Sequence, residues 1–188
     1  MKIRDSLGVA ALLLASLASP TLAQFGPNAD QLVEALRKED TAKALELIRD
    51  HPTLVNNRDS KGDTPLIVAI RKGHTDWTAY LLKAGADPDA AAKDGETPLI
   101  AATRNDMQDV IGWLMNAEAR IDAANKFGET ALIIAIQSRN ARVARALLDA
   151  GADPDKADYT GYSARDHAKR DTRSRRMSEI IEAKKPKK

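Results

Sequence analysis

Hydrophobic and polar positions along residues 60–92 predict two short helices separated by a break. The apolar run PLIVAIRK at residues 65–72 favours a first helix, since Pro65 suits the first helical position, where its missing N–H is not needed. The segment TDWTAYLLKA at residues 75–84 places apolar residues at helical spacing, which predicts a second helix with one apolar face. Gly85 then ends this helix, because glycine adopts the left-handed conformation without a steric penalty.

A tight turn is predicted ahead of the first helix. Gly62 supplies the positive φ angle that such a turn needs, and the hydroxyl of Thr64 can cap the helix that follows. Two short helices bury little apolar surface, at roughly 1.5 to 3 kcal/mol for each large buried side chain. Such a unit is too small to be stable alone and must stack against neighbours.

The same pattern returns every 33 residues. Its copies are SKGDTPLIVAI from Ser60, KDGETPLIAAT from Lys93, KFGETALIIAI from Lys126 and YTGYSARDHAK from Tyr159. Four glycines keep the same register, namely Gly62, Gly95, Gly128 and Gly161. A period of this length is typical of stacked repeat arrays. The composition is 43% hydrophobic but only 4% aromatic, so Ala, Leu and Ile must fill the core.

The central units resemble ankyrin repeats. GDTPLIVAIRKGHTDWTAYLLKAGADPDA, GETPLIAATRNDMQDVIGWLMNAEARIDA and GETALIIAIQSRNARVARALLDAGADPDK carry the glycine turn, the Thr-Pro-Leu helix start and the Gly-Ala-Asp ending with few substitutions. The resemblance covers residues 60–158 nearly continuously. It implies an all-α fold, an α-solenoid of about five helix pairs with β-hairpin-like turns.

The flanking segments are expected to cap the array. Residues 28–59 keep two amphipathic helices without the Thr-Pro-Leu start, at an offset that implies one inserted residue in HPTLVN. Residues 159–188 keep the glycine but exchange apolar positions for charged ones, which predicts a polar outer cap with a basic tail. We therefore divide a single repeat domain, residues 24–188, into units at 28–59, 60–92, 93–125, 126–158 and 159–188.

Some positions depart from the family pattern. Where the family usually has histidine after Thr-Pro-Leu, this chain has Ile67, Ile100 and Ile133. We expect these to replace a hydrogen bond between units by packing. Glu118 replaces the glycine that caps a second helix, so we expect a strained or absent left-handed cap and a soft loop there. Ser163 and Ala164 replace Thr-Pro, which predicts a weaker helix start.

Residues 1–23 have the features of a secretory signal peptide. Lys2 and Arg4 precede an apolar run of about a dozen residues, shorter than the roughly 20 that a membrane-spanning helix needs. We expect cleavage after Ala23, with an internal translation start or a retained anchor as alternatives. The mature chain is then expected to lack a transmembrane segment and to be periplasmic, with secretion as the alternative location. The chain has no cysteine, so neither a disulfide nor lipid attachment at a cleavage-site cysteine is expected.

Charge is unevenly distributed along the chain. The formal net charge is +2, of which the leader contributes +1 and residues 165–188 contribute +6, from ten Lys/Arg against four Asp/Glu. Residues 24–164 therefore carry about −5. A mildly acidic body with a basic tail that lacks interleaved aromatic residues is not typical of a nucleic-acid binder.

No catalytic constellation is visible in the sequence. The three histidines, His51, His74 and His167, lie in different units without a nucleophile or carboxylate at motif spacing. We expect His74 to bond to neighbouring turns. A site assembled between repeats is the alternative under which the protein would be an enzyme.

Metal and phosphate motifs are also weak. The acid pairs of the two GADPD segments, Asp87 with Asp89 and Asp153 with Asp155, lack the further oxygen ligands of a calcium loop. The resemblance instead gives the first acid of each pair a role in a turn. The four turn glycines are not clustered, and none is followed by Gly-Lys-Ser/Thr. We therefore expect no cofactor and no metal.

The remaining candidate binding positions lie on the surface, where the repeat places equivalent side chains in columns. One column, at the ends of the first helices, is rich in cations; a strip at the turn tips mixes acids with aromatic residues, of which Phe127 is the candidate anchor. The same residues can equally be ordinary solvated positions. The candidate partner-binding residues are Arg37, Lys61, Asp63, Arg71, Lys72, Asp94, Glu96, Arg104, Asn105, Phe127, Glu129, Gln137 and Tyr159.

The resemblance implies a non-enzymatic module that binds a protein partner of unknown identity, as a monomer, through its concave and turn-tip face. Exported bacterial proteins of this kind are associated with the support of partner enzymes such as catalases in oxidative-stress defence, and this assignment rests on analogy. One alternative is a factor whose basic tail binds acidic lipid or polyanions. Another is a secreted effector that binds host proteins.

Overall fold

The structure, a computed structural model, describes residues 29–171, 173 and 175–184. The predicted signal peptide, residues 1–23, lies outside these residues, as does the end of the basic tail. The elements are α1 (Ala29–Arg37), α2 (Thr41–Asp50), the 3-10 helix η1 (Pro52–Asn56), α3 (Pro65–Arg71), α4 (Thr75–Lys83), α5 (Pro98–Arg104), α6 (Gln108–Asn116), α7 (Ala131–Gln137), α8 (Ala141–Asp149), α9 (Ala164–Arg170) and α10 (Arg175–Glu182).

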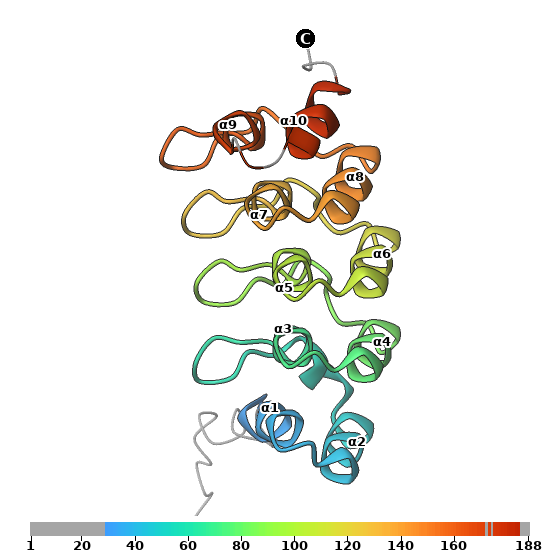
Figure 1. The fold of residues 1–188 in the computed structure, drawn as a ribbon. Coiled ribbons are helices and arrows are strands. Elements are labelled where there is room, and N and C mark those ends of the chain that lie inside the picture. Colours follow the sequence, from blue (N-terminus) through green and yellow to red (C-terminus); the bar gives the residue numbers. More distant parts are fainter. Residues whose placement is uncertain (1–28, 172, 174, 185–188) are drawn as a thin grey trace, which may run out of the picture.

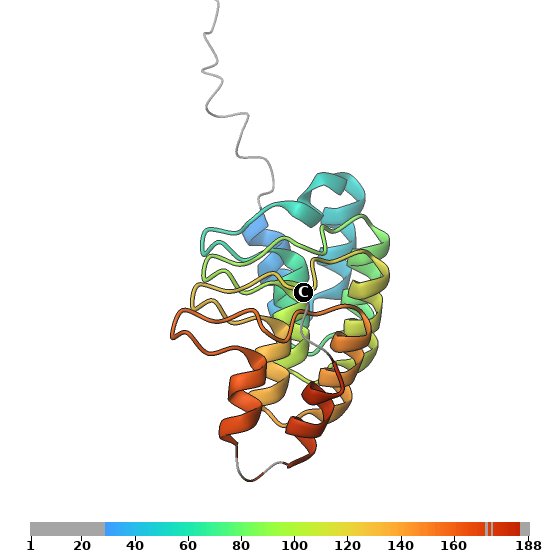
Figure 2. The same ribbon diagram turned by 90° about the horizontal axis from the view of Figure 1, so that it is seen from above.

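The helices form five pairs that stack in one direction. Odd-numbered helices make one column and even-numbered helices a second column beside it (Figure 1). The turns that precede α3, α5, α7 and α9 all project to the same side, away from the second column (Figures 1 and 2). The predicted α-solenoid is confirmed. No helix within the described ranges is long and apolar enough to cross a membrane.

The first helix of each central repeat starts with a threonine cap. The hydroxyls of Thr64, Thr97 and Thr130 accept hydrogen bonds from the backbone N–H three residues later. The weaker start predicted at Ser163 is wrong. Ser163 and Asp166 form a reciprocal capping box, in which each side chain accepts a hydrogen bond from the other residue's N–H.

Glycine is required at the turn tips for two reasons. Gly62, Gly95 and Gly128 all have φ between +76° and +86°. In addition, a Cβ on Gly95 would lie 2.9 Å from the backbone nitrogen of Lys126, and one on Gly128 would lie 2.7 Å from that of Tyr159. Neighbouring turns therefore approach closely, and the backbone N–H of Tyr159 donates to the carbonyl of Phe127 at 3.0 Å.

A continuous apolar core runs through the stack. Ile67, Ile100 and Ile133 are completely buried, as predicted for residues that pack between repeats. Because equivalent side chains of successive repeats share this core, each helix pair is stabilised mainly by its neighbours.

Several local predictions need correction or refinement. The inserted residue before Ser60 is accommodated by η1, which buries Leu54 and Val55. Glu118 does adopt the left-handed conformation, with φ 59°, where the equivalent caps are Gly85 and Gly151. The C-terminal unit is more than a polar cap, since α10 buries apolar side chains against its neighbours, at Met177, Ile180 and Ile181.

Candidate interaction surface

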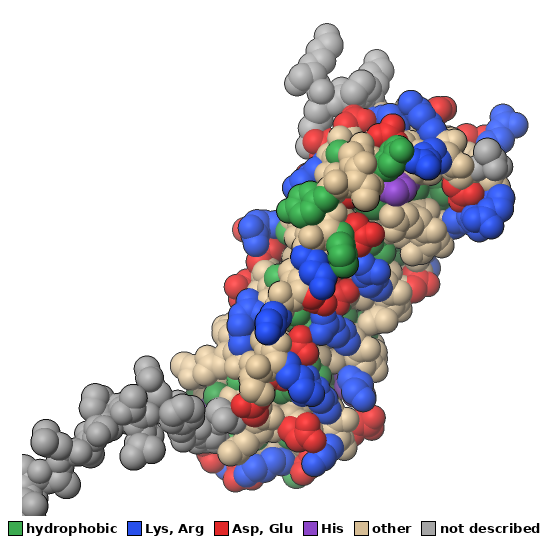
Figure 3. Space-filling model, turned by 90° about the vertical axis from the view of Figure 1, so that its left-hand side faces the viewer, with side chains coloured by type: hydrophobic (Ala, Val, Ile, Leu, Met, Phe, Trp, Pro, Cys, Tyr) green, Lys and Arg blue, Asp and Glu red, His purple; other side chains and the backbone are tan. Residues whose placement is uncertain are grey.

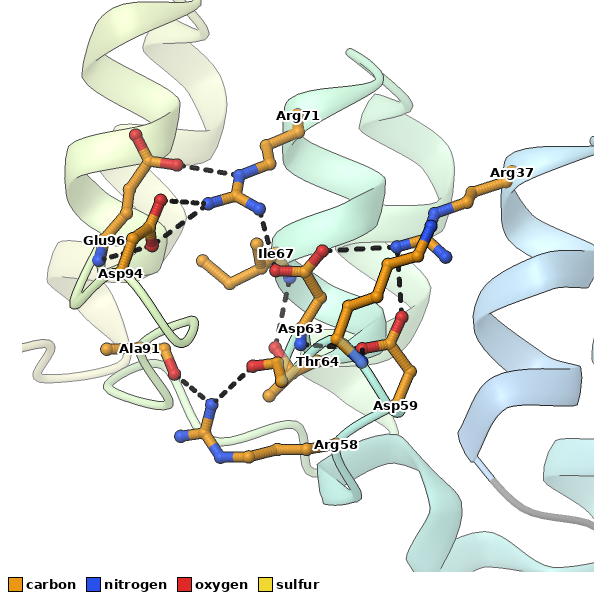
Figure 4. Close-up of polar contacts among 12 residues, drawn as sticks. Arg37, Arg58, Asp59, Asp63, Thr64, Ile67, Arg71, Ala91, Asp94 and Glu96 are labelled. Atoms are coloured by element: carbon orange, nitrogen blue, oxygen red, sulfur yellow. Dashed lines mark hydrogen bonds and ion pairs between the residues drawn. The ribbon is translucent and has the colours of Figure 1, made fainter.

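Arg71, the last residue of α3, holds three carboxylates from two successive turns. Its guanidinium lies 2.8 Å from Asp63 Oδ1 in its own repeat, and 3.0 Å from Asp94 Oδ2 and 2.8 Å from Glu96 Oε2 in the next (Figure 4). Nearby, Arg58 donates to the carbonyls of Gly62 and Ala91, so that it also joins two turns (Figure 4).

Other repeats copy this arrangement. Arg37 at the end of α1 lies 3.0 Å from Asp59 and 3.2 Å from Asp63. Arg104 at the end of α5 lies 3.1 Å from Glu96 and 3.0 Å from Glu129. Arginines and acids thus alternate in an ion-pair ladder made of Arg37, Asp63, Arg71, Glu96, Arg104 and Glu129.

The ladder joins the two surface features that the sequence places apart. The arginine column and the acidic tip residues face one another and largely neutralise each other's charge. Burial alone would lower the pKa of Arg71, but its hydrogen bond to Glu96 and the neighbouring carboxylates raise that pKa. Arg71 therefore stays charged, and its charge is matched within the chain.

The remaining polar candidates have mixed surroundings. Asn105 donates from Nδ2 to the carbonyl of Ile70 at 3.0 Å and so joins two repeats. Lys72 and Gln137 are exposed at the ends of α3 and α7. The side chain of Lys61 is exposed at a turn tip, while its backbone N–H donates to Asp59.

Aromatic side chains gather at the C-terminal turn tips. Phe127 is 57% exposed and Tyr159 is 80% exposed. A Cβ on Gly128 would lie 2.8 Å from Tyr159 Cδ1, so the Tyr159 ring lies over the tip that carries Phe127. Figure 3 shows hydrophobic side chains near the C-terminal end of this face, above repeats where basic and acidic side chains alternate.

The ladder stops where the aromatic residues begin. Gln137 stands where α3 and α5 have arginine, and Tyr162 stands where earlier tips have Asp63, Glu96 and Glu129. Arg170 at the end of α9 therefore meets an aromatic ring, with its Cζ 4.2 Å from the centroid of Tyr162. The 33-residue period places Arg170 in the arginine column and Tyr162 in the turn-tip strip, but neither is among the candidate partner-binding residues predicted from the sequence.

Among the described residues, no group of three or more His, Cys, Asp or Glu side chains is arranged to hold a metal ion. The acid pairs have structural roles within turns and between repeats. Asp87 Oδ1 accepts the N–H of Asp89 at 2.8 Å, and Asp89 accepts the N–H of Arg120 in the next repeat at 2.9 Å. In the last repeats, Asp155 pairs with Arg165 at 2.6 Å.

The histidines differ from one another. His167 Nε2 lies 3.0 Å from the buried Asp158. Burial would raise the pKa of Asp158, but hydrogen bonds from Thr160, His167 and Tyr162 outweigh it and hold that pKa well below its usual range. His74 Nε2 is buried without a hydrogen-bond partner in the described structure, so this nitrogen does not form the predicted hydrogen bond to a neighbouring turn. It does lie 3.9 Å from Glu39 Oε1, in the turn between α1 and α2 of the neighbouring unit.

Comparison with known proteins identifies a matching family. A family model described as ankyrin repeats (3 copies) matches residues 8–125 and 84–158. No curated protein matches the chain.

Proposed function

Because the chain belongs to the ankyrin-repeat family, we propose that it is an exported, non-enzymatic scaffold that binds a partner protein through its concave and turn-tip face. Ankyrin repeats indicate a protein–protein interaction module. The export, the face and the partner are the parts that need a test.

The exposed aromatic residues at the turn tips are the observation that carries this proposal. Phe127 and Tyr159 project from adjacent tips, and neither is buried by the chain itself. Aromatic side chains provide much of the energy of protein interfaces when a partner buries them, because they bring large area at little loss of conformational freedom.

The ion-pair ladder has a supporting role in this proposal. Arg71 and Arg104 each contact the turns of two consecutive repeats, so they fix the spacing of those turns. A surface that is ordered before binding loses less entropy when it binds. The ladder therefore fixes the spacing of the turns as far as the tip that carries Phe127, which Arg104 reaches through Glu129.

Export and partner class rest on sequence and resemblance. The leader at residues 1–23 supports a periplasmic location. Resemblance to exported ankyrin-repeat proteins supports a partner enzyme that works in stress defence. Mass spectrometry of the protein from cells tests the first point, since cleavage after Ala23 predicts an N-terminus at Gln24.

Photo-crosslinking in intact cells tests the binding face. Benzoylphenylalanine would replace Tyr159 at the tips or, as a control, Tyr80, a 39% exposed tyrosine on α4 in the second helix column. We expect a discrete crosslinked protein from position 159 and none from position 80. The same product from both positions, or a product from position 80 alone, would contradict the proposed face.

Substitutions that test the binding face must leave the ion pairs of the ladder intact. Arg71→Glu would place a fourth carboxylate among Asp63, Asp94 and Glu96, so lost binding in that variant would not separate recognition from unfolding. Phe127→Ala and Tyr159→Ala remove exposed rings and leave every ladder pair intact. With benzoylphenylalanine in place of Tyr162 at the last turn tip, we expect each substitution to reduce crosslinking to the partner, with unchanged helix content by circular dichroism.

A further inference from the structure

The end of the ladder leaves cationic side chains without matching acids. In the central repeats, an arginine contacts a tip acid eight positions earlier, as Arg71 does with Asp63 and Arg104 with Glu96. The equivalent pair in the last repeat is Arg170 with Tyr162. Within the described part of the chain, Arg170 makes no ion pair.

A cavity of about 340 Å³ opens beside Arg170, between the ends of α7 and α9. Its charged lining comprises Arg139, Arg170 and Arg173 against one acid, Asp171, with His167 and Gln137 completing the polar wall. Arg139 occupies Asp171 with two contacts, at 2.5 and 3.1 Å, and Arg173 lies 3.6 Å from the same carboxylate. One carboxylate serves these two arginines, so the lining keeps an excess of positive charge.

Apolar area lies on the same face as this cavity. Tyr162, under Arg170, is 39% exposed, and the more exposed rings of Phe127 and Tyr159 occupy adjacent turn tips. We define the C-terminal patch as Phe127, Tyr159, Tyr162, Arg139, Arg170 and Arg173. It combines aromatic rings with incompletely neutralised arginines, the two residue types most enriched at interface hot spots.

We propose that the C-terminal patch binds an acidic segment of the partner protein, in which Asp or Glu carboxylates enter the arginine-lined cavity and a neighbouring apolar side chain covers the exposed rings. This inference rests on the proposed function and specifies its partner. Arginine suits carboxylates because its planar guanidinium can donate two parallel hydrogen bonds.

A nucleic acid fits this surface less well. Residues 24–164 carry about −5, so a long polyanion that extends along the face would meet net negative charge. Arg170 lies over the Tyr162 ring, and Lys126 Nζ lies 5.1 Å from the centroid of the Phe127 ring. One face of each ring is therefore already in contact with a cation, which leaves less ring surface on which a base could stack. A short acidic peptide needs only the local positive cavity.

Fluorescence anisotropy with defined probes tests the chemistry. The probe is a fluorescein-labelled ten-residue peptide that alternates glutamate with leucine. One comparison probe has glutamine at every glutamate position, and the other is a labelled thymidine decanucleotide. We expect the purified protein to bind the glutamate peptide at low salt, and to bind both comparison probes at least about tenfold more weakly.

Tyr162→Glu is the most specific variant, because it restores the tip acid of the earlier repeats and gives Arg170 an internal partner without removing any arginine. We expect it to weaken binding of the glutamate peptide about tenfold, as Arg170→Gln should by direct loss of the cation. The control is Arg142→Gln, which removes an equal charge from an exposed position on α8 and should leave the affinity unchanged.

The proposal is overturned if the glutamine peptide binds equally well, if the decanucleotide binds as tightly as the glutamate peptide, or if Arg142→Gln is as harmful as Arg170→Gln. Circular dichroism of each variant separates lost binding from lost folding, and Arg173→Gln provides a second test if Arg170→Gln unfolds. Crosslinking from position 159 would persist if only the acidic chemistry were wrong. Its absence would instead contradict the proposed function.

Discussion

Replacement of Arg71 by methionine should destabilise the array by more than the loss of an ordinary surface charge. The variant keeps an unbranched aliphatic stem but removes ion pairs to Asp63, Asp94 and Glu96. The Arg71 side chain is 33% exposed, so each pair is partly screened by water. At about 0.2 to 1 kcal/mol for each exposed pair, three pairs contribute about 1 to 2 kcal/mol after this discount.

Urea denaturation at low salt, followed by circular dichroism, measures this difference. The matched control is Arg49→Met, because Arg49 is 74% exposed and, in the part of the chain that the structure describes, forms an ion pair only with its neighbour Asp50. We expect the control to change the free energy of unfolding by less than about 0.5 kcal/mol. At about 1 M salt the Debye length falls to about 3 Å, so much of the excess effect of Arg71→Met should disappear.

A double-mutant cycle identifies the source of the effect. Glu96→Gln combined with Arg71→Met should cost less than the sum of the two single variants, by about 0.5 kcal/mol or more, since the pair has already been lost in either one. The reasoning is refuted if Arg71→Met and Arg49→Met change the free energy of unfolding equally. It is also refuted if the effect of Arg71→Met is additive with that of Glu96→Gln and insensitive to salt. In either case the ion pairs of the ladder would contribute nothing measurable to stability.

Three further predictions concern the fold. Glu118→Gly should raise the melting temperature by about 1 to 4 °C, because relief of a left-handed non-glycine residue exceeds the entropy added to the unfolded chain. Ile100→Ala should lower the free energy of unfolding by about 2 to 5 kcal/mol in urea, since it opens a cavity in the centre of the stack. The pKa of Asp158 is lower in the folded than in the unfolded state, so ionised Asp158 stabilises the fold above its unfolded pKa. This stability is lost as the pH falls toward the lower folded pKa. Asp158→Asn should therefore make the melting temperature fall less steeply below about pH 4. Asn125 occupies the equivalent position one repeat earlier, so this variant should still fold, and an unchanged acid profile would contradict the assignment.

Most of the fold is predictable because its determinants are local and repeated. Thr64 and Gly62 act within a few residues of their own position, and the 33-residue period copies their effect along the chain. The capping box of Ser163 and Asp166 was also readable as a Ser-x-x-acid pattern. The apolar side of α10 was harder to recognise, because its buried residues lie among many charged ones.

The candidate site was less predictable, because contacts between repeats are not visible in one repeat. The columns that contain Arg71 and Glu96 were both evident from the period, but nothing local showed that they face each other across 25 residues. The meaning of Gln137 and Tyr162 depended on that pairing. Only after the ladder is known do these two residues mark the place where it ends.

The two parts of the surface differ in what a partner can gain from them. A partner that approaches Arg71 or Arg104 must compete with carboxylates already within about 3 Å, and separation of such pairs offsets much of any new contact. Phe127 and Tyr159 instead expose apolar area that the chain does not bury, and Arg170 faces a ring in place of an acid. Association energy is therefore expected to concentrate where the ladder ends, while the paired repeats fix the geometry in which that end is presented.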